Sequence, residues 1–390
     1  MNLSTKPKNQ RFSLIKAILP LTLTQFQYSL LSIIALFIFM MMNPVFAGSL
    51  EVESAFSWGR LVMTLAGGLA FFLYGMEKMS EGMKKSAGDR MRNILSALTN
   101  NRIIAMSVGA FVTMVIQSSS ATTVMLVSFV QAQLMTFVQS LGVILGADIG
   151  TTITAQLVAF KLTDYALVMI AVGFALTMFS KKDSTKYLGE AILGFGILFF
   201  GMKLMSDAMK PLRTFQPFID LLKGLENPVL GLLVGTLFTA LVQSSSAFTG
   251  IVIVLAQQGL LSLEAGIPLV MGANIGTCIT AGLASIGTSR EAKRVAIAHV
   301  MFKVGGVLLF IFWIPTFADI IRSISPTSVG LDGMDKLASE TPRQIANAHT
   351  IFNVSLALFF LPFTTMFANL IMKIYPEREQ EKGIQPATWR

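Results

Sequence analysis

The polar motif QSSSA occurs twice in the chain, at Gln117 and at Gln243, and both copies lie inside long apolar runs. A second pair of motifs, GADIGTTIT from Gly146 and GANIGTCIT from Gly272, has the same separation of 126 residues. A third pair, YGMEKMSEGMK and FGMKLMSDAMK, keeps that separation again. One gapless offset over three motifs indicates an internal duplication, so the fold must contain two copies of one unit.

The apolar runs around these motifs are long enough to cross a bilayer. Of the 390 residues, 53% are hydrophobic and only 13% are charged, whereas about a quarter of the residues in soluble domains are charged. A membrane-spanning helix needs about 20 apolar residues, and residues 295–314 and 351–374 form runs of this kind. The runs do not alternate with polar residues as barrel strands do. The sequence therefore predicts an all-α polytopic membrane protein.

The formal net charge of +9 does not indicate a nucleic-acid partner, because the basic residues form short clusters between apolar runs. Cys278 is the one cysteine, so no intrachain disulfide can form, and no Cys/His spacing predicts a transition-metal site. Near the N-terminus, an apolar run at 30–42 is followed by Val45-Phe46-Ala47. These residues fit either a cleaved signal peptide or a retained first helix.

The charge pattern decides how the two copies are oriented in the membrane. If each QSSS segment enters the membrane and returns as a hairpin, each unit crosses the membrane three times and the two copies are inverted. If each QSSS segment instead crosses the membrane once, each unit crosses four times and the two copies are parallel. The segments 77–102, 181–186 and 288–294 are basic and are predicted to be cytoplasmic, which fits three crossings. We therefore predict an inverted-topology repeat with re-entrant hairpins at 103–130 and 229–256.

The predicted organisation follows from these crossings. Residues 1–58 form the signal or first helix, 59–184 the first repeat, 185–316 the second repeat, 317–343 an external loop, and 344–390 the last transmembrane helix with a cytoplasmic tail. Transmembrane helices are expected around residues 59–76, 136–160, 164–179, 187–204, 261–284, 295–314 and 344–373.

The serines of the two QSSS motifs are suited to bind an anion. Non-helical backbone at membrane depth must be buried in protein or line a water-filled cavity. A serine that caps the second arm of each hairpin would leave free N–H groups and the positive end of a helix dipole facing the centre. The candidate ligands for an oxyanion such as phosphate or sulfate are Ser118, Ser119, Ser120, Ser244, Ser245 and Ser246.

Amide, hydroxyl and carboxylate oxygens near these motifs are suited to Na⁺ rather than to a soft metal. Glycines in GADIGTT and GANIGTC allow the helix to break there and expose further ligands. The candidate Na⁺ ligands are Gln117, Thr122, Thr123, Asp148, Thr151, Thr152 and Thr154 in the first repeat, and Gln243, Thr249, Asn274, Thr277 and Thr280 in the second.

Asp148 differs from the other candidates because its counterpart in the second repeat is the neutral Asn274. A carboxylate at membrane depth predicts a cation or proton role; the alternative is that it accepts bonds from a broken helix end. His299 and His349 lie in AHVMFK and AHTIFN, where we expect them near helix starts and bonded to backbone. Lys303 is expected to form a salt bridge or to snorkel rather than to bind substrate.

The doubled QSSS motifs with downstream GA-D/N-IGT motifs resemble the sodium/phosphate cotransporter family, the type II class with bacterial members. The resemblance extends over residues 59–374. It implies that the QSSS motifs lie at re-entrant tips and bind phosphate and Na⁺, and that Thr277 and Thr280 bind Na⁺. Where family members commonly carry a further threonine, this chain has Cys278, so only its backbone carbonyl could serve as a ligand there.

The function expected from these features is Na⁺-driven import of inorganic phosphate by alternating access, and not an enzymatic activity. No cofactor is expected besides Na⁺ as the coupling ion, and the expected partners are phosphate, Na⁺ and the lipid bilayer of the cell inner (plasma) membrane; homo-oligomerisation stays open. One alternative is transport of another oxyanion, or H⁺ coupling through Asp148. An intramembrane serine hydrolase is disfavoured, since neither motif contains a histidine and no GxSxG elbow is present.

Overall fold

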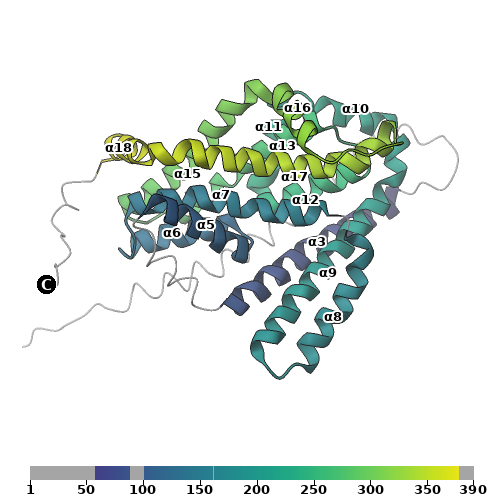
Figure 1. The fold of residues 1–390 in the computed structure, drawn as a ribbon, viewed down its shortest axis with the longest axis horizontal. Coiled ribbons are helices and arrows are strands. Elements are labelled where there is room, and N and C mark those ends of the chain that lie inside the picture. The colour runs from purple at the N-terminus through teal and green to yellow at the C-terminus, as the bar shows by residue number, and fades with distance from the viewer. Residues whose placement is uncertain (1–57, 88–100, 161, 377–390) are drawn as a thin grey trace, which may run out of the picture. The chain divides into compact units, whose positions relative to one another are not determined.

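The computed structural model describes residues 58–87, 101–160 and 162–376 (Figure 1). Throughout these residues the regular secondary structure is helical. Six of the described helices are long and apolar enough to cross a membrane, and a seventh span results if one bent helix pair is counted as a unit. The chain is therefore a multi-pass, all-α membrane protein, as predicted. The predicted signal or first helix lies outside the described residues.

The described helices occupy the predicted transmembrane ranges and also part of the predicted external loop at 317–343. They are α3 (Trp58–Ala87), α5 (Arg102–Ile116), α6 (Ser119–Gln131), α7 (Phe137–Ala159), α8 (Ala166–Phe179), α9 (Asp183–Met209), α10 (Gln216–Gly224), α11 (Pro228–Val242), α12 (Ser245–Gln257), α13 (Leu263–Gly276), α14 (Cys278–Ala284), α15 (Arg290–Phe310), α16 (Ile314–Ile324), α17 (Gly333–Phe360) and α18 (Thr364–Ile374). Short 3₁₀ turns connect several of them: η1 (Thr163–Tyr165), η2 (Lys210–Thr214), η3 (Ile311–Trp313) and η4 (Leu361–Phe363).

The sequence duplication is also a duplication of structure. Helices α5, α6 and α7 begin 126 residues before α11, α12 and α13 respectively. The same side chains start the first helix of each set: Asn101 accepts hydrogen bonds from backbone N–H groups of α5, and Asn227 does so for α11. Such caps satisfy N–H groups that have no acceptor inside the helix. We call α5–α7 the first copy and α11–α14 the second copy.

Glycine allows α7 to approach α5 closely, and this explains why one predicted feature is wrong. We expected a helix break in GADIGTT, but α7 runs through it without interruption. A Cβ atom on Gly146 would lie 1.9 Å from the carbonyl oxygen of Met106 on α5, and one on Gly150 would lie 2.4 Å from that of Ala110. These glycines therefore serve helix packing. In the second copy α13 and α14 meet at Thr277, whose backbone is itself helical, so residues 263–284 form one span with only a local irregularity at the expected break.

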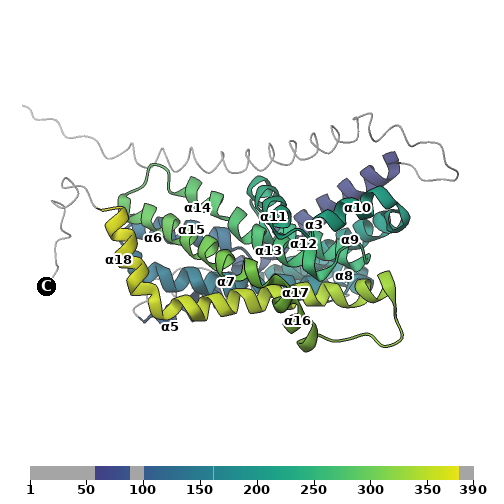
Figure 2. The ribbon, with the colours of Figure 1, turned by 90° about the horizontal axis from the view of Figure 1, so that it is seen from above.

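The remaining helices divide into two groups. Helix α9 packs against both α3 and α8 (Figure 1); a Cβ atom on Gly75 would lie 2.3 Å from the backbone nitrogen of Leu198, so α3 and α9 are in close backbone contact. The long helices α15 and α17 instead pack against the two copies. Helix α17 lies alongside α7 (Figures 1 and 2), and α15 contacts α6 and α7.

Candidate functional site

Each QSSS motif forms a sharp break between two short helices. Helix α5 ends at Ile116, Gln117 adopts a left-handed conformation with φ 58°, and α6 starts at Ser119. In the second copy Gln243 has φ 57° at the same place between α11 and α12. Positive φ is uncommon for residues other than glycine and often marks functional sites. The same unusual backbone therefore occurs at both motifs.

The first serine of each motif caps the helix that follows. The Ser118 hydroxyl accepts a hydrogen bond from the Ala121 N–H at 3.1 Å, and the Ser244 hydroxyl accepts one from the Ala247 N–H at 3.2 Å. The N–H groups of the next two residues have no acceptor within the helix because of their position in its first turn. Ser119 and Ser245 are both 5% exposed. Each copy thus presents a capped helix N-terminus with serines in its first turn.

In the first copy the polar groups around the break bond to one another. The Gln117 amide donates to the Met114 carbonyl at 2.5 Å and accepts from the Thr154 hydroxyl on α7 at 2.7 Å. The hydroxyls of Thr113 and Thr122 lie 2.9 Å apart, and both residues are fully buried. The candidate ligands Gln117, Thr122 and Thr154 therefore lie close together and already have partners.

The second copy lacks these internal bonds. The hydroxyls of Thr239, Thr249 and Thr280 are buried and have no hydrogen-bond partner within the described residues. Thr280 corresponds to Thr154, and Thr239 corresponds to Thr113, whose partner Thr122 is replaced by Phe248. Buried polar groups in native proteins are nearly always satisfied. Three unsatisfied hydroxyls in one copy therefore require an explanation.

The remaining threonines of the GA-D/N-IGT segments bond to their own helices. The hydroxyls of Thr151 and Thr152 donate to the Ala147 and Ile149 carbonyls at 2.9 and 2.7 Å. In the second copy the Thr277 hydroxyl donates to the Asn274 carbonyl at 2.7 Å. These bonds orient the side chains and leave oxygen lone pairs available, since a hydroxyl has two.

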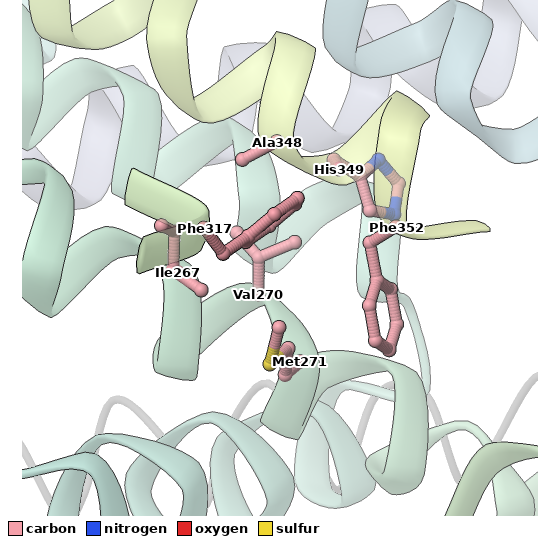
Figure 3. Close-up of a pocket in the computed structure, with 7 residues that line it drawn as sticks. All are labelled: Ile267, Val270, Met271, Phe317, Ala348, His349 and Phe352. Atoms are coloured by element: carbon pink, nitrogen blue, oxygen red, sulfur yellow. The ribbon is translucent and has the colours of Figure 1, made fainter. Parts of the chain in front are cut away.

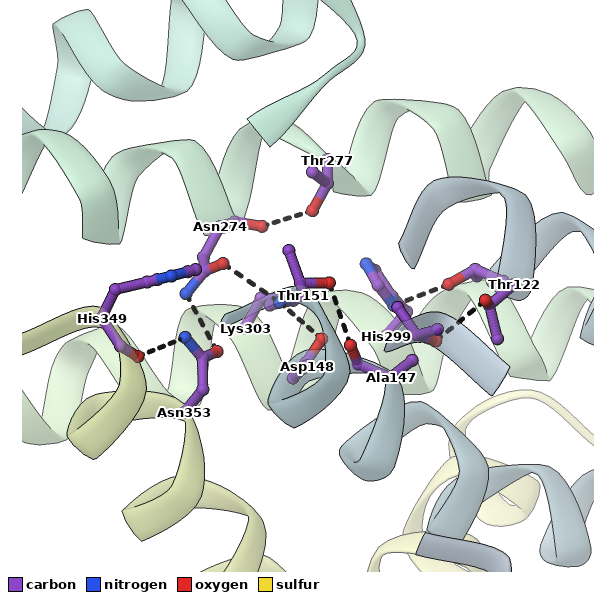
Figure 4. A network of polar contacts seen from close by, with 12 residues as sticks. Thr122, Ala147, Asp148, Thr151, Asn274, Thr277, His299, Lys303, His349 and Asn353 are labelled. Carbon is purple, nitrogen blue, oxygen red and sulfur yellow. Dashed lines mark hydrogen bonds and ion pairs between the residues drawn. The ribbon is translucent and has the colours of Figure 1, made fainter. Parts of the chain in front are cut away.

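A buried ion pair connects α7 to α15, and the partner of Lys303 in this pair was not predicted. The Asp148 carboxylate lies 2.7 Å from the Lys303 ammonium, and the two side chains are 10% and 4% exposed. Lys303 also donates to the Asn274 amide oxygen at 3.3 Å, so the ammonium lies between the two copies (Figure 4). The Asn274 amide donates in turn to Asn353 on α17 at 3.2 Å. Lys303 therefore forms the predicted salt bridge, and it does not snorkel.

A second internal repeat explains this arrangement. His299, Phe302 and Lys303 lie 50 residues before His349, Phe352 and Asn353, and the following elements η3 and α16 lie 50 residues before η4 and α18. Helix α15 packs against α6 and α7 of the first copy, and α17 packs against α12 and α13 of the second copy as well as against α7 of the first. The pair Asp148–Lys303 is therefore the counterpart of the pair Asn274–Asn353. The motifs AHVMFK and AHTIFN were the signal for this repeat.

Both histidines lie well inside their helices and are buried, which corrects our expectation that they are near helix starts. The Nδ1 atom of His299 lies 3.5 Å from the hydroxyl of Thr123 in the first copy. In the second copy, Nδ1 of His349 and the hydroxyl of the corresponding Thr249 both lack a partner within the described chain. His299 thus lies next to the second arm of the first QSSS break.

A cavity next to His349 is too small for an oxyanion. It has a volume of about 10 Å³ and is otherwise lined by apolar side chains, including Ile267, Phe317 and Phe352 (Figure 3). A cavity needs about 10–15 Å³ to hold one water molecule. This cavity therefore could not hold a phosphate ion, and it does not compete with the QSSS breaks as an anion site.

Comparison with known proteins identifies relatives over most of the described chain. The Na⁺/Pi-cotransporter family matches residues 71–207 and 215–336. YqeW, an uncharacterised protein of Bacillus subtilis (strain 168), is 32% identical over 259 residues, which are 66% of this chain and 84% of YqeW. No solved structure matches the chain.

Two further relatives have names that describe phosphate transport. YjbB of Escherichia coli O157:H7, named for inorganic phosphate export, is 27% identical over 68% of this chain and 49% of its own length. The human sodium-dependent phosphate transport protein 2B is 36% identical over 32% of this chain and 20% of its own length. The chain thus spans about half of YjbB and less of the human protein. Since the family match covers more than half of the sequence, this chain belongs to the Na⁺/Pi-cotransporter family.

Proposed function

We propose that the protein couples phosphate transport to Na⁺ and works by alternating access. Family membership supports phosphate as the transported substrate. The observation that carries the proposal is the duplicated break, in which Gln117 and Gln243 share one left-handed conformation and the next serine caps a helix. Two such helix starts supply N–H groups, hydroxyls and positive dipole ends for an oxyanion.

Phosphate would bind at the serines of both motifs. In each copy the first serine hydroxyl already caps the helix through the N–H three residues later. The following serines and their backbone N–H groups would then be the main donors to the anion. These donors are Ser119 and Ser120 in the first copy and Ser245 and Ser246 in the second.

Na⁺ would bind mainly in the second copy. The unsatisfied hydroxyls of Thr249 and Thr280 are hard oxygen ligands, and the structure gives the Gln243 side chain no hydrogen bond to another described residue. Asn274 and Thr277 lie close to one another in sequence, at the end of α13 and at its junction with α14. In the first copy, the corresponding oxygens already have hydrogen-bond partners, and these bonds would have to break before the oxygens could bind Na⁺.

The lengths of the short helices support a re-entrant hairpin in each copy. Helices α5 and α6 contain 15 and 13 residues, which at about 1.5 Å per residue gives about 20 Å each. The hydrocarbon core is about 30 Å thick, so neither arm crosses it alone. With hairpins that enter and return, each predicted repeat (59–184 and 185–316) crosses three times, which is the inverted topology favoured by the charge pattern.

The direction of transport would follow from the gradients. In a membrane that keeps Na⁺ low inside, such as the cell inner membrane, coupling to Na⁺ favours phosphate import. The two relatives with transport names differ here, since one is named for export and the other only for sodium dependence. Asp148 as a free proton carrier is disfavoured, because its carboxylate is already paired with Lys303.

Uptake of radiolabelled phosphate into proteoliposomes tests the proposal. An inward Na⁺ gradient should stimulate uptake, and uptake that is indifferent to the gradient would refute Na⁺ coupling. Ser245→Ala and Gln243→Ala should each lower uptake strongly. Ser323→Ala is a matched control, because this exposed serine only bonds to the Ile320 carbonyl and should tolerate the change. Full activity of both site variants would refute the proposed site.

A further inference from the structure

The two copies differ in charge at one equivalent pair of positions. Asp148 and Lys303 form an ion pair in the first copy, while Asn274 and Asn353 form an amide–amide hydrogen bond in the second. The repeats of 126 and 50 residues relate the members of these pairs one to one. The charges are therefore a specific feature of the first copy.

The Lys303 ammonium is held by oxygen atoms, as a bound cation would be. It lies 2.7 Å from the Asp148 carboxylate and 3.3 Å from the Asn274 amide oxygen, and these oxygens come from the two equivalent positions (Figure 4). Both residues were predicted as Na⁺ ligands from their chemistry. Carboxylate and amide oxygens are hard ligands of the kind that bind such ions.

The carboxylate of Asp148 requires a positive charge at this depth. An ionised group inside a membrane protein is costly unless it is paired, and removal of one partner from a buried pair is strongly destabilising. Lys303 supplies that charge from the neighbouring helix α15, without an ion from solution. The pair in the second copy is neutral and joined by a direct hydrogen bond, so it carries no charge that a cation must balance.

We propose that the Lys303 ammonium is a built-in cation that occupies, beside Asp148, the place which a Na⁺ ion would otherwise fill. This inference rests on the proposed Na⁺-coupled function. The transporter then requires fewer Na⁺ ions from solution than its oxygen ligands could hold. Replacement of Lys303 by a neutral side chain creates an additional Na⁺ site at Asp148.

The first test is the stability of Lys303→Asn, which introduces the residue found at the equivalent position on α17, Asn353. Thermal unfolding of the purified protein in detergent is compared in NaCl and in choline chloride. A cation that binds only the folded state raises its stability, so Na⁺ should raise the melting temperature of Lys303→Asn by several degrees more than that of the wild type. An equal Na⁺ effect on both proteins would overturn the inference.

Three further variants make this result specific. Lys303→Gln, whose amide can still donate to Asp148, should show the same additional rise in melting temperature with Na⁺. This variant replaces Lys303→Asn in the test if Lys303→Asn does not fold. Asp148→Asn/Lys303→Asn removes both charges and should show no gain. Lys85→Asn is a matched control, because Lys85 pairs with Glu190 at 3.0 Å in a partly exposed position; it should respond to Na⁺ like the wild type. A gain in the double variant would overturn the inference.

The dependence of uptake on Na⁺ separates this inference from the proposed function. If both hold, the Hill coefficient for Na⁺ should rise by about one in Lys303→Asn, because one more ion is linked to transport. If wild-type uptake does not respond to Na⁺, the proposed coupling fails, but Lys303→Asn should then acquire a Na⁺ requirement. An unchanged Na⁺ dependence in the variant would overturn the inference in either case.

Discussion

The first and second copies have the same helices and the same left-handed glutamine, but their polar side chains are engaged differently. In the first copy Gln117 bonds to Thr154, and Asp148 bonds to Lys303. In the second copy the hydroxyls of Thr249 and Thr280 have no partner within the described residues. The comparison shows that a duplicated chain can keep a similar arrangement of helices while a few substitutions change which polar side chains are bonded in each copy.

The largest expected effect comes from the ion pair that only the first copy has. Lys303→Met leaves Asp148 buried without a partner and should lower the free energy of unfolding by about 3–5 kcal/mol in the absence of Na⁺. Chemical denaturation in detergent measures this change. Asp148→Asn/Lys303→Met should recover most of the loss, since it leaves no unpaired charge. A double variant as unstable as the single one would show that packing, and not charge, dominates here.

The close contact of α5 with α7 and the matching contact of α11 with α13 should be equally sensitive to the replacement of a glycine by alanine. Gly146→Ala places a Cβ atom 1.9 Å from the Met106 carbonyl oxygen, and Gly272→Ala places one 2.2 Å from that of Leu232. Each should lower the free energy of unfolding by about 1–3 kcal/mol through overpacking.

Gly67→Ala on α3 is the control for this prediction. A Cβ atom there meets no other atom within 4 Å, so the substitution should stabilise the helix by up to about 1 kcal/mol. Thermal unfolding of the three variants measures the difference, and Gly67→Ala should unfold at the highest temperature. Similar stability of all three would contradict the assignment of Gly146 and Gly272 to helix packing.

The two glutamines should respond differently to the same substitution. Gln117→Ala removes hydrogen bonds to Met114 and Thr154 and should lower the free energy of unfolding by about 1–3 kcal/mol. Gln243→Ala should leave stability almost unchanged and weaken the Na⁺ dependence of uptake. Denaturation and Na⁺ titration of both variants measure the contrast. The reverse pattern would show that the Na⁺ site lies in the first copy.

The capping serines should give the smallest and most nearly equal effects. Ser118→Ala and Ser244→Ala each remove one cap of the same geometry, and each should cost about 1 kcal/mol. Hydrogen exchange of the first turns of α6 and α12 would report the local loss. A large difference between the two variants would show that the two caps do not stabilise their helices equally.

The sequence was sufficient to predict most helices and the 126-residue duplication, because both depend on patterns that can be read along the chain. Apolar length, capping residues such as Ser118 and Ser244, and one constant offset locate most of the observed helices. The re-entrant and inverted topology of the copies stays a prediction, because the charge pattern supports it but the fold alone does not test it.

Three features of the site required the structure. The glycines of GADIGTT fit either a helix break or close packing, and only the contact of Gly146 with α5 decides between them. The partner of Asp148 lies on a helix far away in the chain, so no spacing rule reveals Lys303. The 50-residue repeat was also missed, because most of the residues that α15 and α17 share, such as Ala298 and Val304, are small or apolar and are common in any membrane helix.

The most direct test of the account is the simultaneous flux of radiolabelled Na⁺ and phosphate through the reconstituted wild-type protein. We expect the two ions to enter together in a fixed ratio under an inward Na⁺ gradient. We also expect Gln243→Ala to lower the phosphate-dependent Na⁺ flux more than the control Ser323→Ala does. Phosphate flux that carries no Na⁺ with it would contradict the central claim.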